Sequence, residues 1–370
     1  MEYQPTPRAK HAIDAAGERA GCADSASVLR ILDASSNRAR EGIRVVEDYV
    51  RFVLDDRHLT GLCKRLRHDL AAVLRRTATE HRLAARETQA DVGTAVTTPS
   101  EQTRGDLGDV LTANLVRLQE SLRSLEEYGK LIDAEMAARL EQLRYRSYTL
   151  QRAVEITRSS LGRLEDTCLY VLIDGRSSLD EFRHLAESLV GSPAEAGVHV
   201  LQLRDKRLDD RQLLERGRML RELTHRSRTL FIMNDRADLA ALAHADGVHV
   251  GQEELSVKDA RSIVGPEALI GVSTHSIEQA RQAVLDGANY IGIGPTFPSG
   301  TKRFEQFPGL ELLKSVAAEI RLPAFAIGGI TQENLPDVLA TGIHRVAVGG
   351  AVAGADNPAD AAQQMFTELR

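Results

Sequence analysis

Eight short apolar runs, each followed by an amphipathic stretch, fill the second half of the chain and constrain its fold more than any other feature. The runs are residues 168–174, 198–204, 229–235, 247–251, 269–274, 290–295, 324–329 and 345–350. Apolar runs of this length, bounded by turn residues, are typical of buried strands. Strands that alternate with helices form parallel sheets, and eight units in about 200 residues suit a closed (β/α)8 barrel. We therefore predict a C-terminal TIM barrel, with an open doubly wound sheet as the alternative.

The residues before this pattern have a different rhythm. From about 25 to 160, apolar residues recur at spacings of three and four, and Pro99 is the single proline, a pattern typical of amphipathic helices. Residues 1–24 are rich in Ala, Pro and charge, and we expect them to form a poorly ordered leader. The sequence thus predicts an all-α helical bundle domain over 25–160 and a barrel over 166–370.

The charge balance and the lack of long apolar windows exclude several classes of protein. The chain has 47 Lys and Arg residues against 53 Asp and Glu residues, so its bulk charge indicates neither a nucleic-acid partner nor an anionic membrane. No window reaches the roughly 18 apolar residues that a membrane span needs, and the N-terminus has no apolar signal core. Cys22, Cys63 and Cys168 lack the spacing of a zinc site. We expect a soluble, cytoplasmic protein, and leave open whether it is a homo-oligomer.

Polar residues follow the predicted strands at the end where (β/α)8 barrels carry their active sites. The first group is cationic: Arg204 and Lys206 follow one strand and Lys302 lies in a later loop, with Gln202 and Asn234 as neutral donors. Guanidinium and ammonium groups suit phosphate oxygens. Alternate residues of an extended chain face one side, so the first three strand-end groups, Gln202 to Lys206, should point together. Simple solvation of strand-end charges is the alternative.

Two carboxylates at neighbouring strand ends form the second group. Asp235 follows the third strand and Glu254 lies beyond the fourth. Such a pair suits Mg²⁺, which prefers oxygen ligands and shares them with phosphate groups. Salt bridges to Arg204 and Lys206 are one alternative, and general acid–base catalysis is another.

Paired glycines form the third group. Gly328-Gly329 and Gly349-Gly350 follow the seventh and eighth strands, where barrels often hold a phosphate against backbone N–H groups. Glycines also serve tight turns, which is the alternative. The barrel is thus predicted to have one anion site suited to a diphosphate and another suited to a monophosphate.

Three histidines lie within or at the ends of predicted strands of the barrel. His199 and His249 lie inside strands, and we expect them to be packed and hydrogen-bonded rather than catalytic. His275 stands at a strand end, where contact with a substrate is left open.

Several segments, taken in order, resemble the thiamine-phosphate synthase family. They are QLRDK, ND at 234–235, GVHVGQEEL, GVSTHS, GPTFPSGTK, AIGGI and the final Gly-Gly. The resemblance covers about 165–370 and implies an enzyme that joins a pyrimidine diphosphate to a thiazole phosphate and releases pyrophosphate. A thiazole tautomerase or a non-catalytic ligand sensor on the same barrel is the alternative. A tautomerase needs no full diphosphate and metal set, which this chain has.

The resemblance also implies a role for each matched position. It assigns the pyrimidine diphosphate to Gln202, Leu203, Arg204, Asp205, Lys206, Asn234, Ser273 and Lys302. It assigns the thiazole phosphate to Ser299, Gly300, Thr301, Gly329, Gly349 and Gly350. The expected catalytic residues are Arg204, Lys206, Ser273 and Lys302. Asp235 and Glu254 match the Mg²⁺ ligands, although the family usually has Asp at the second position. Glu253 is not expected to replace it, because neighbours in an extended segment face opposite ways.

The helical half contains an internal repeat. Residues 41–49 and 120–128 both fit ExxRxxE[DE]Y. On a helix, the first copy carries a polar stripe of Asn37, Glu41, Arg44 and Asp48 opposite an apolar face of Ala39, Ile43, Val46 and Val50. The second copy sets Glu120, Arg123 and Glu127 opposite Leu118, Leu122 and Leu125. The stripes are either solvent faces with ion pairs or the two walls of a polar pocket.

The segment LDASSNRAREGIRVVEDYVRFVLDD, followed by LRHDL, resembles the ThiD2-type domain found ahead of some thiamine-phosphate synthases. That resemblance implies a hydroxymethylpyrimidine phosphate kinase, which would supply the diphosphate substrate of the barrel. This half has no P-loop or Gly-rich nucleotide loop. A dimerisation or docking domain is the alternative.

Overall fold

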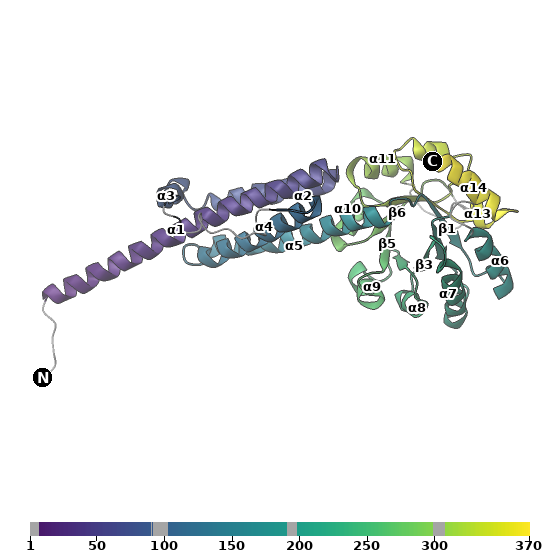
Figure 1. Cartoon of the computed structure of the whole chain (residues 1–370), viewed down its shortest axis with the longest axis horizontal. Coiled ribbons are helices and arrows are strands. Elements are labelled where there is room, and N and C mark those ends of the chain that lie inside the picture. The colour runs from purple at the N-terminus through teal and green to yellow at the C-terminus, as the bar shows by residue number, and fades with distance from the viewer. Residues whose placement is uncertain (1–6, 90, 92–102, 191–197, 299–307) are drawn as a thin grey trace. The chain divides into compact units, whose positions relative to one another are not determined.

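The chain divides into two compact units, which are described separately. The structure is a computed structural model that describes residues 7–89, 91, 103–190, 198–298 and 308–370, with side chains from residue 25 onward (Figure 1). One unit comprises Met1–Asp55 and Leu59–Gln151, and the other comprises Asp56–His58 and Arg152–Arg370. None of the described helices has the length and apolarity that crossing a membrane requires.

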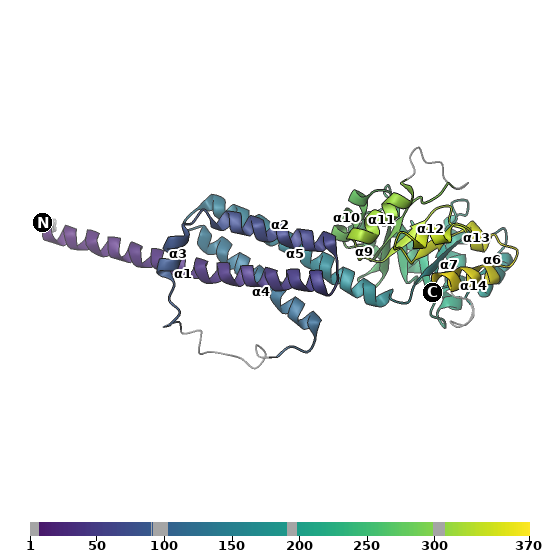
Figure 2. The ribbon, with the colours of Figure 1, turned by 90° about the horizontal axis from the view of Figure 1, so that it is seen from above.

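The first unit is all-helical. Its helices are α1 (Pro7–Phe52), α2 (Arg57–Leu74), α3 (Thr79–Ala85), α4 (Leu107–Gly129) and α5 (Ala134–Arg163), the last of which continues into the second unit. Figure 2 shows α1 and α4 lying along each other. Helix α1 includes residues 7–24, and the expectation of a poorly ordered leader there stays a prediction.

Helices α1 and α4 pack through the apolar faces that the repeat predicts. Ile43 and Val46 of α1 and Leu118 and Leu125 of α4 are fully buried. Gly42 brings the two backbones together, since a Cβ there would lie 3.0 Å from the carbonyl oxygen of Asn114. Each such apolar side chain contributes about 1.5–3 kcal/mol when buried. The predicted division into apolar and polar faces is confirmed.

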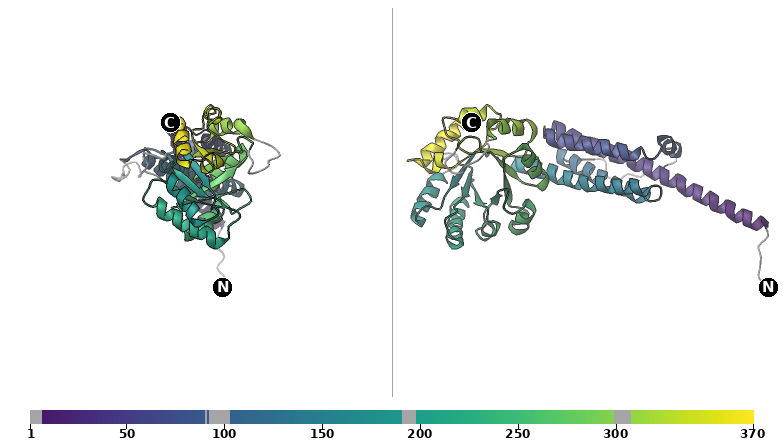
Figure 3. Two further views of the ribbon diagram at one scale, coloured as in Figure 1. Left: turned by 90° about the vertical axis from the view of Figure 1, so that its right-hand side faces the viewer. Right: turned by 180° about the vertical axis from the view of Figure 1, so that it is seen from behind.

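The second unit is a closed barrel of eight parallel strands in sequential order, so the predicted TIM barrel after a helical region is confirmed. Its strands are β1 (Leu169–Ile173), β2 (Val200–Leu203), β3 (Leu230–Asn234), β4 (Gly247–Val250), β5 (Leu269–Thr274), β6 (Tyr290–Ile293), β7 (Ala324–Ile327) and β8 (Val346–Val348). The helices outside it are α6 (Leu179–Leu189), α7 (Asp210–Thr224), α8 (Ala237–Leu242), α9 (Val257–Val264), α10 (Ile277–Asp286), α11 (Gly309–Glu319), α12 (Leu335–Leu339), α13 (Gly350–Ala353) and α14 (Pro358–Leu369). Figure 3 shows these helices arranged around the strands.

Short polar side chains start several of the barrel helices. Ser178, Asp209, Ser256 and Ser276 precede α6, α7, α9 and α10, and each accepts a hydrogen bond from the backbone N–H three residues later. Such N-caps contribute about 1 kcal/mol each. They fix where each loop from a strand end gives way to its helix.

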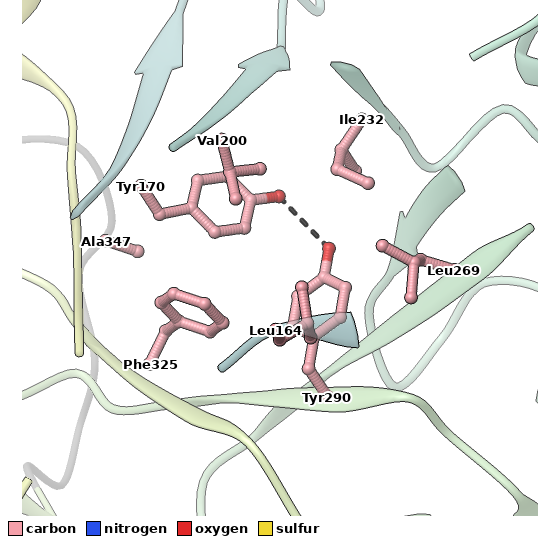
Figure 4. Packing of buried hydrophobic residues seen from close by; sticks show 8 residues of the cluster. All are labelled: Leu164, Tyr170, Val200, Ile232, Leu269, Tyr290, Phe325 and Ala347. Carbon is pink, nitrogen blue, oxygen red and sulfur yellow. Dashed lines mark hydrogen bonds between the residues drawn. The ribbon is translucent and has the colours of Figure 1, made fainter. Parts of the chain in front are cut away.

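An aromatic layer fills the interior of the barrel (Figure 4). Tyr170 and Tyr290 meet through their hydroxyl groups at 3.1 Å. The ring of Phe325 packs edge-on against both, with centroid separations of 5.3 and 5.6 Å. The other buried members of this cluster are Leu164, from the segment after α5, and Val200, Ile232, Leu269 and Ala347 of the strands. The side chains of the strands that point inward fill the interior of a closed barrel in this way, so it is a packed core rather than a pore.

Candidate functional site

A cavity of about 300 Å³ lies at the carboxyl ends of β2 to β5. It is lined by Arg204, Lys206, Asn234, Asp235, His249, Gly251, Gln252, Glu253, Glu254, Ser273 and His275. The structure therefore brings together six residues that the sequence singles out as candidate site residues: Arg204, Lys206, Asn234, Asp235, Glu254 and Ser273. These come from four successive strands, as the strand-end rule for barrels requires.

The cationic side of the cavity follows β2. The strand ends at Leu203, and the N–H of Arg204 continues the pairing by donating to the Ile173 carbonyl at 2.9 Å. Lys206 is exposed and its Nζ lies 3.7 Å from Oδ2 of Asp235. The predicted alternation does not bring Gln202 to the cavity wall, because its buried side chain lies inside the barrel.

Two residues assigned to the substrate are engaged within the protein. The Asp205 carboxylate accepts hydrogen bonds from the backbone N–H of Gly175 at 3.0 Å and of Arg207 at 2.7 Å. The Arg207 side chain also donates to it and, with those backbone donors, holds the pKa of Asp205 far below its usual range. Leu203 is buried in the barrel wall. Neither of these side chains lines the cavity.

The two predicted metal-binding carboxylates lie in the same cavity. Asp235 has a left-handed backbone with φ of 60° and a half-buried side chain. Burial and the charge of Glu254 raise the pKa of Asp235, against the opposing influence of Lys206 and Arg204. The Glu254 carboxylate turns back over Gly251, since a Cβ on that glycine would lie 2.2 Å from Glu254 Oε2. Two like charges thus share one side of the cavity.

The segment that carries Glu254 corrects one step of the sequence argument. Residues 252–254 form a bend rather than an extended segment, so facing does not alternate there. As a result Glu253 and Glu254 both line the cavity, and Glu253 cannot be set aside on that ground. The side chain of Gln252 donates to the Ser273 carbonyl at 2.6 Å and holds the bend against β5.

A chain of hydrogen bonds runs beneath the cavity from β2 to β5. Gln202 Nε2 donates to the hydroxyl of Tyr170 at 2.9 Å, and that hydroxyl lies 3.1 Å from the hydroxyl of Tyr290. Nδ1 of His249 lies 3.3 Å from Tyr290, and Nε2 lies 2.9 Å from Ser273 Oγ. Both ring nitrogens of His249 are thus hydrogen-bonded, which confirms the expectation that this histidine is packed and satisfied.

The directions of these hydrogen bonds follow from donor and acceptor chemistry. Because Gln202 donates to Tyr170, the buried Tyr170 hydrogen points to Tyr290, and the Tyr290 hydrogen points to Nδ1 of His249. Burial and the charge of Arg204 lower the pKa of His249 to about 4, so its ring is neutral near pH 7. A neutral ring that accepts at Nδ1 carries its proton on Nε2. It then donates to Ser273, whose own hydroxyl hydrogen can be donated into the cavity.

His275, whose role the sequence leaves open, lies on the wall of the cavity. Its Nδ1 lies 2.6 Å from the Gly294 carbonyl, which can only accept, so Nδ1 carries a proton. The His275 backbone N–H donates to Gln279 at 2.7 Å. His199 lies elsewhere, and its Nδ1 accepts from the Leu169 N–H at 3.4 Å.

Comparison with known proteins identifies the family. The family model described as "Thiamine monophosphate synthase" matches residues 169–352, and the ThiD2 family model matches residues 30–153. The thiamine-phosphate synthase of Rhodopirellula baltica is 48% identical over 343 residues, which cover 90% of each chain. The chain belongs to the thiamine-phosphate synthase family.

A further curated relative and a solved structure are also similar to this chain. The thiamine-phosphate synthase of Synechocystis sp. is 40% identical over 347 residues, covering 94% of this chain and 98% of that protein. A solved thiamine phosphate pyrophosphorylase from Pyrococcus furiosus is 33% identical, with a TM-score of 0.48, and covers 55% of this chain and 97% of that one. Like its family, the chain is a diphosphate-releasing transferase of thiamine biosynthesis, with an N-terminal ThiD2 domain.

Thiamine-phosphate synthases typically use Mg²⁺, and the carboxylates of this chain fit that ion. Asp235 and Glu254 line one cavity, and after burial the charge of Glu254 is the next cause of the raised pKa of Asp235. Mg²⁺ is commonly bound by one or two carboxylates together with substrate phosphates. Among the described residues, no group of three or more His, Cys, Asp or Glu side chains is arranged so that it could hold a metal ion by itself. The donor set thus suits an ion that the substrate helps to hold.

The glycines predicted for a synthase's second phosphate follow β7 and β8. Gly329 has φ of 65°, and a Cβ there would lie 2.6 Å from the Pro298 carbonyl oxygen, so this turn requires glycine. Gly349 precedes α13, and Gly350 begins it. The remaining predicted residues of the loop, Ser299, Gly300, Thr301 and Lys302, lie outside the described residues.

Of the two alternatives for the repeat in the ThiD2 domain of this synthase, an exposed face with ion pairs describes the second stripe, where Arg123 lies 2.7 Å from Glu127. A cavity lies along the first stripe, between α1 and α2, and it is not formed with the second stripe: Glu120, Arg123 and Glu127 are exposed and do not line it. The sequence also missed two buried carboxylates within the repeat, Glu47 and Glu126. Each is paired with arginines, one of which comes from another helix.

Proposed function

We propose that the barrel condenses 4-amino-2-methyl-5-(diphosphomethyl)pyrimidine with 4-methyl-5-(2-phosphoethyl)thiazole, giving thiamine phosphate and pyrophosphate. The observation that carries this proposal is the cavity at β2 to β5, where Arg204 and Lys206 face two carboxylates, Asp235 and Glu254. A diphosphate has enough negative charge to engage the cations directly and the carboxylates through Mg²⁺. The family membership supports the same pair of substrates.

In this proposal the departing group is stabilised by charge. Arg204 offers a planar fork of donors to the diphosphate oxygens, and Lys206 adds a mobile positive charge. When bound between Asp235 and Glu254, Mg²⁺ would neutralise the negative charge that grows on the diphosphate. The bond between the pyrimidine methylene and the diphosphate oxygen breaks, and its electron pair leaves with pyrophosphate.

The methylene carbon is then a carbocation, which the thiazole nitrogen attacks with its lone pair to form the new C–N bond. No proton is transferred in these two steps, so the site needs positioning and electrostatic stabilisation rather than a general base. Ser273 supports the proposal as a hydrogen-bond donor to the pyrimidine diphosphate, oriented by His249. Lys302 and the glycines after β7 and β8 complete the proposed phosphate contacts.

The test is formation of thiamine phosphate from the two phosphorylated substrates, with Mg²⁺ and with a chelator. We expect turnover only with the metal, and loss of about 100-fold or more in kcat for Arg204→Ala. Arg218→Ala, an exposed arginine of α7 outside the cavity, is the matched control and should keep full activity. Equal activity of the two variants would reject the assignment of this cavity.

We further propose that the helical unit phosphorylates hydroxymethylpyrimidine phosphate and so supplies the diphosphate for the barrel. The match of residues 30–153 to the ThiD2 family supports this role, together with the linkage of both units in one chain. The test is ATP-dependent ADP formation by the full chain carrying Arg204→Ala, with hydroxymethylpyrimidine phosphate as substrate. Absence of ADP would leave a structural or docking role for the unit.

A further inference from the structure

A cavity of about 570 Å³ lies on the helical unit, between α1 and α2, and we name it the α1–α2 groove. Its floor includes Val45 and Ala71, both half-buried. Its volume lies within the range of about 300–1,000 Å³ that is typical of small-molecule sites. An apolar floor of this kind suits a flat ring rather than an extended polar chain.

The rim of the groove is cationic. Arg40, Arg44, Arg67 and His68 line it, and Glu41 is the one acidic residue that does. Arg40 has neither a hydrogen bond nor an ion pair within the part of the chain that the structure describes. The positive charges are therefore not matched by the acid on the rim.

The buried Glu47 holds two of these arginines in place. Its carboxylate is 2% exposed, accepts a hydrogen bond from Arg67 Nε at 3.0 Å and lies 3.7 Å from Arg44 Nη1. One carboxylate thus faces two guanidinium groups, which leaves net positive charge at the groove. The terminal nitrogens of Arg67 and the exposed part of Arg44 retain N–H donors, since each guanidinium has five.

Positive charge also extends beyond the groove. Burial, Arg40 and Arg86 lower the pKa of Arg82 on α3, against the opposing effect of Asp33. Arg86 is itself bound to Asp33 through two hydrogen bonds of 2.6 and 2.9 Å. Arg40 therefore lies in a region where cations crowd one another, and an anion there would relieve that repulsion.

The second copy of the repeat has the same buried carboxylate and paired arginines, but aromatic residues contact one of those arginines. Glu126 is buried like Glu47 and is bound by Arg123 at 2.7 Å and by Arg144 at 2.8 Å. There, however, Arg144 also donates to Tyr148 at 3.2 Å and lies 4.8 Å from the centre of the Tyr145 ring. Tyrosines thus contact the Arg144 guanidinium in the second copy, whereas the arginines of the first copy border the groove.

We propose that the α1–α2 groove binds a phosphate monoester of a small heteroaromatic alcohol. The phosphate would lie against Arg40 and Arg44, with His68 as a further donor, and the ring would lie on Val45 and Ala71. A phosphate monoester carries close to two negative charges at pH 7, which matches the excess of cations. This inference deepens the proposed role of the helical unit by assigning it a substrate site.

Binding is measured by calorimetry on the full chain carrying Arg204→Ala and Lys206→Ala, which weaken the barrel's own anion site. The probes are hydroxymethylpyrimidine phosphate, adenosine monophosphate and inorganic phosphate. We expect the pyrimidine phosphate to bind most tightly of the three. Tightest binding of adenosine monophosphate would make the groove a nucleotide site and overturn the proposal. Binding of no probe, or of all three with equal affinity, would overturn a site for a ring phosphate.

The groove is then tested by matched variants. Arg40→Gln should weaken binding by about 10-fold or more, since hydrogen bonds to charged groups contribute about 1.5–3 kcal/mol. Arg123→Gln, the position in the second repeat that corresponds to Arg44, should leave it unchanged. Ala71→Leu, which fills the floor without altering charge, should weaken the ring esters but not inorganic phosphate. Unaltered binding in Arg40→Gln, or equal loss in Arg123→Gln, would overturn the proposal.

The proposed binding site and the proposed kinase activity can be rejected independently of each other. If Arg40→Gln loses binding while ADP formation by the full chain persists unchanged, the groove is not the substrate site and the kinase proposal stands. If the groove binds the pyrimidine phosphate but no ADP forms, the site stands and the kinase proposal fails. Helical content by circular dichroism distinguishes both results from misfolding of the variant.

Discussion

The barrel cavity and the α1–α2 groove contain the same residue types but balance them in opposite ways. In the cavity, Asp235 and Glu254 are close enough for burial and mutual repulsion to raise the pKa of Asp235, although Lys206 lies 3.7 Å away. At the groove, Arg67 and Arg44 of the lining pair with the buried Glu47, which does not itself line it. The carboxylates that line the cavity, Asp235, Glu253 and Glu254, outnumber its two cations and suit the site to a metal ion. The arginines that line the groove outnumber its acidic residues and suit that site to an anion.

The support beneath the two sites differs as well. The cavity rests on neutral groups, in a hydrogen-bonded chain that ends at His249 and Ser273. The groove rests on a buried ion pair. Neutral polar chains inside a protein depend on every member being paired, whereas breaking a buried ion pair leaves an uncompensated charge. The two units should therefore respond differently to pH and to the loss of a single charge.

The largest expected effect is loss of synthase activity when a surplus carboxylate is neutralised. Asp235→Asn removes one of the two charges that suit Mg²⁺ while keeping the size of the side chain. We expect thiamine phosphate formation to fall by about 100- to 1,000-fold, in the range seen when one group that stabilises transition-state charge is removed. Glu41→Gln on the rim of the groove is the control and should keep full synthase activity. Full activity of Asp235→Asn would show that the barrel cavity does not depend on this carboxylate to hold a cation.

The next effect is a loss of barrel stability in mild acid. His249 has a pKa of about 4 in the folded state, lowered by burial and Arg204, against about 6.5 when unfolded. Between these values the unfolded chain binds the additional proton, so the stability present above pH 6.5 is lost as the pH falls towards 4. The full loss is about 3 kcal/mol.

Denaturant unfolding of the barrel at pH 7 and pH 5 measures this loss, and His249→Gln should flatten the dependence. The carbon NMR chemical shifts of the His249 imidazole report its charge directly, and at pH 5.5 they should still be those of a neutral ring. A histidine that titrates near pH 6.5 in the folded chain would contradict the assignment of a neutral chain beneath the cavity.

The fold of the barrel followed from sequence, whereas the support of its site did not. Buried parallel strands appear as continuous apolar runs, so the ends of each predicted strand lie no more than two residues from those of an observed one. Alternation applies only while a strand continues, and β2 ends at Leu203, so Gln202 lies below the cavity and Arg204 at its wall. The bend at 252–254 depends on a side-chain contact to β5, which no periodicity reports.

The helical unit teaches the same lesson at the level of a single helix. The repeat predicted the apolar faces because each follows from the period of one helix. The burial of Glu47 and Glu126 was not predicted, because it depends on Arg67 and Arg144, which belong to other helices. A helical projection of one segment cannot show which residue of its neighbour covers it.

The third effect separates the two copies of the repeat. Glu126→Gln should lower the free energy of unfolding of the helical unit by about 2–3 kcal/mol, because it leaves Arg144, whose side chain is 11% exposed, without its carboxylate. Glu47→Gln should cost about 1 kcal/mol, because the Arg67 side chain is 26% exposed and water can replace part of the interaction.

Urea unfolding of both variants, followed by circular dichroism, measures the difference. Glu135→Gln is the control and should change little, because the pairs that Glu135 makes with Arg139 and Arg76 are open to solvent. Equal losses of stability in Glu47→Gln and Glu126→Gln would show that water in the groove does not compensate Arg67 for the lost carboxylate.

The smallest effect tests whether the longer acidic side chain is used as a ligand. The Glu254 carboxylate lies over Gly251, where a Cβ would be 2.2 Å from its Oε2. Gly251→Ala therefore displaces that carboxylate without changing any charge, and a flexible side chain can yield without unfolding the barrel. We expect the Mg²⁺ concentration for half-maximal activity to rise by about 10-fold, near the lower end of the effects seen when a ligand loses its support. Gly162→Ala on α5, where a Cβ meets nothing within 4 Å, is the steric control. A Mg²⁺ requirement that stays unchanged in Gly251→Ala but rises in Glu253→Gln would assign the second carboxylate to Glu253, which the bend brings to the same cavity.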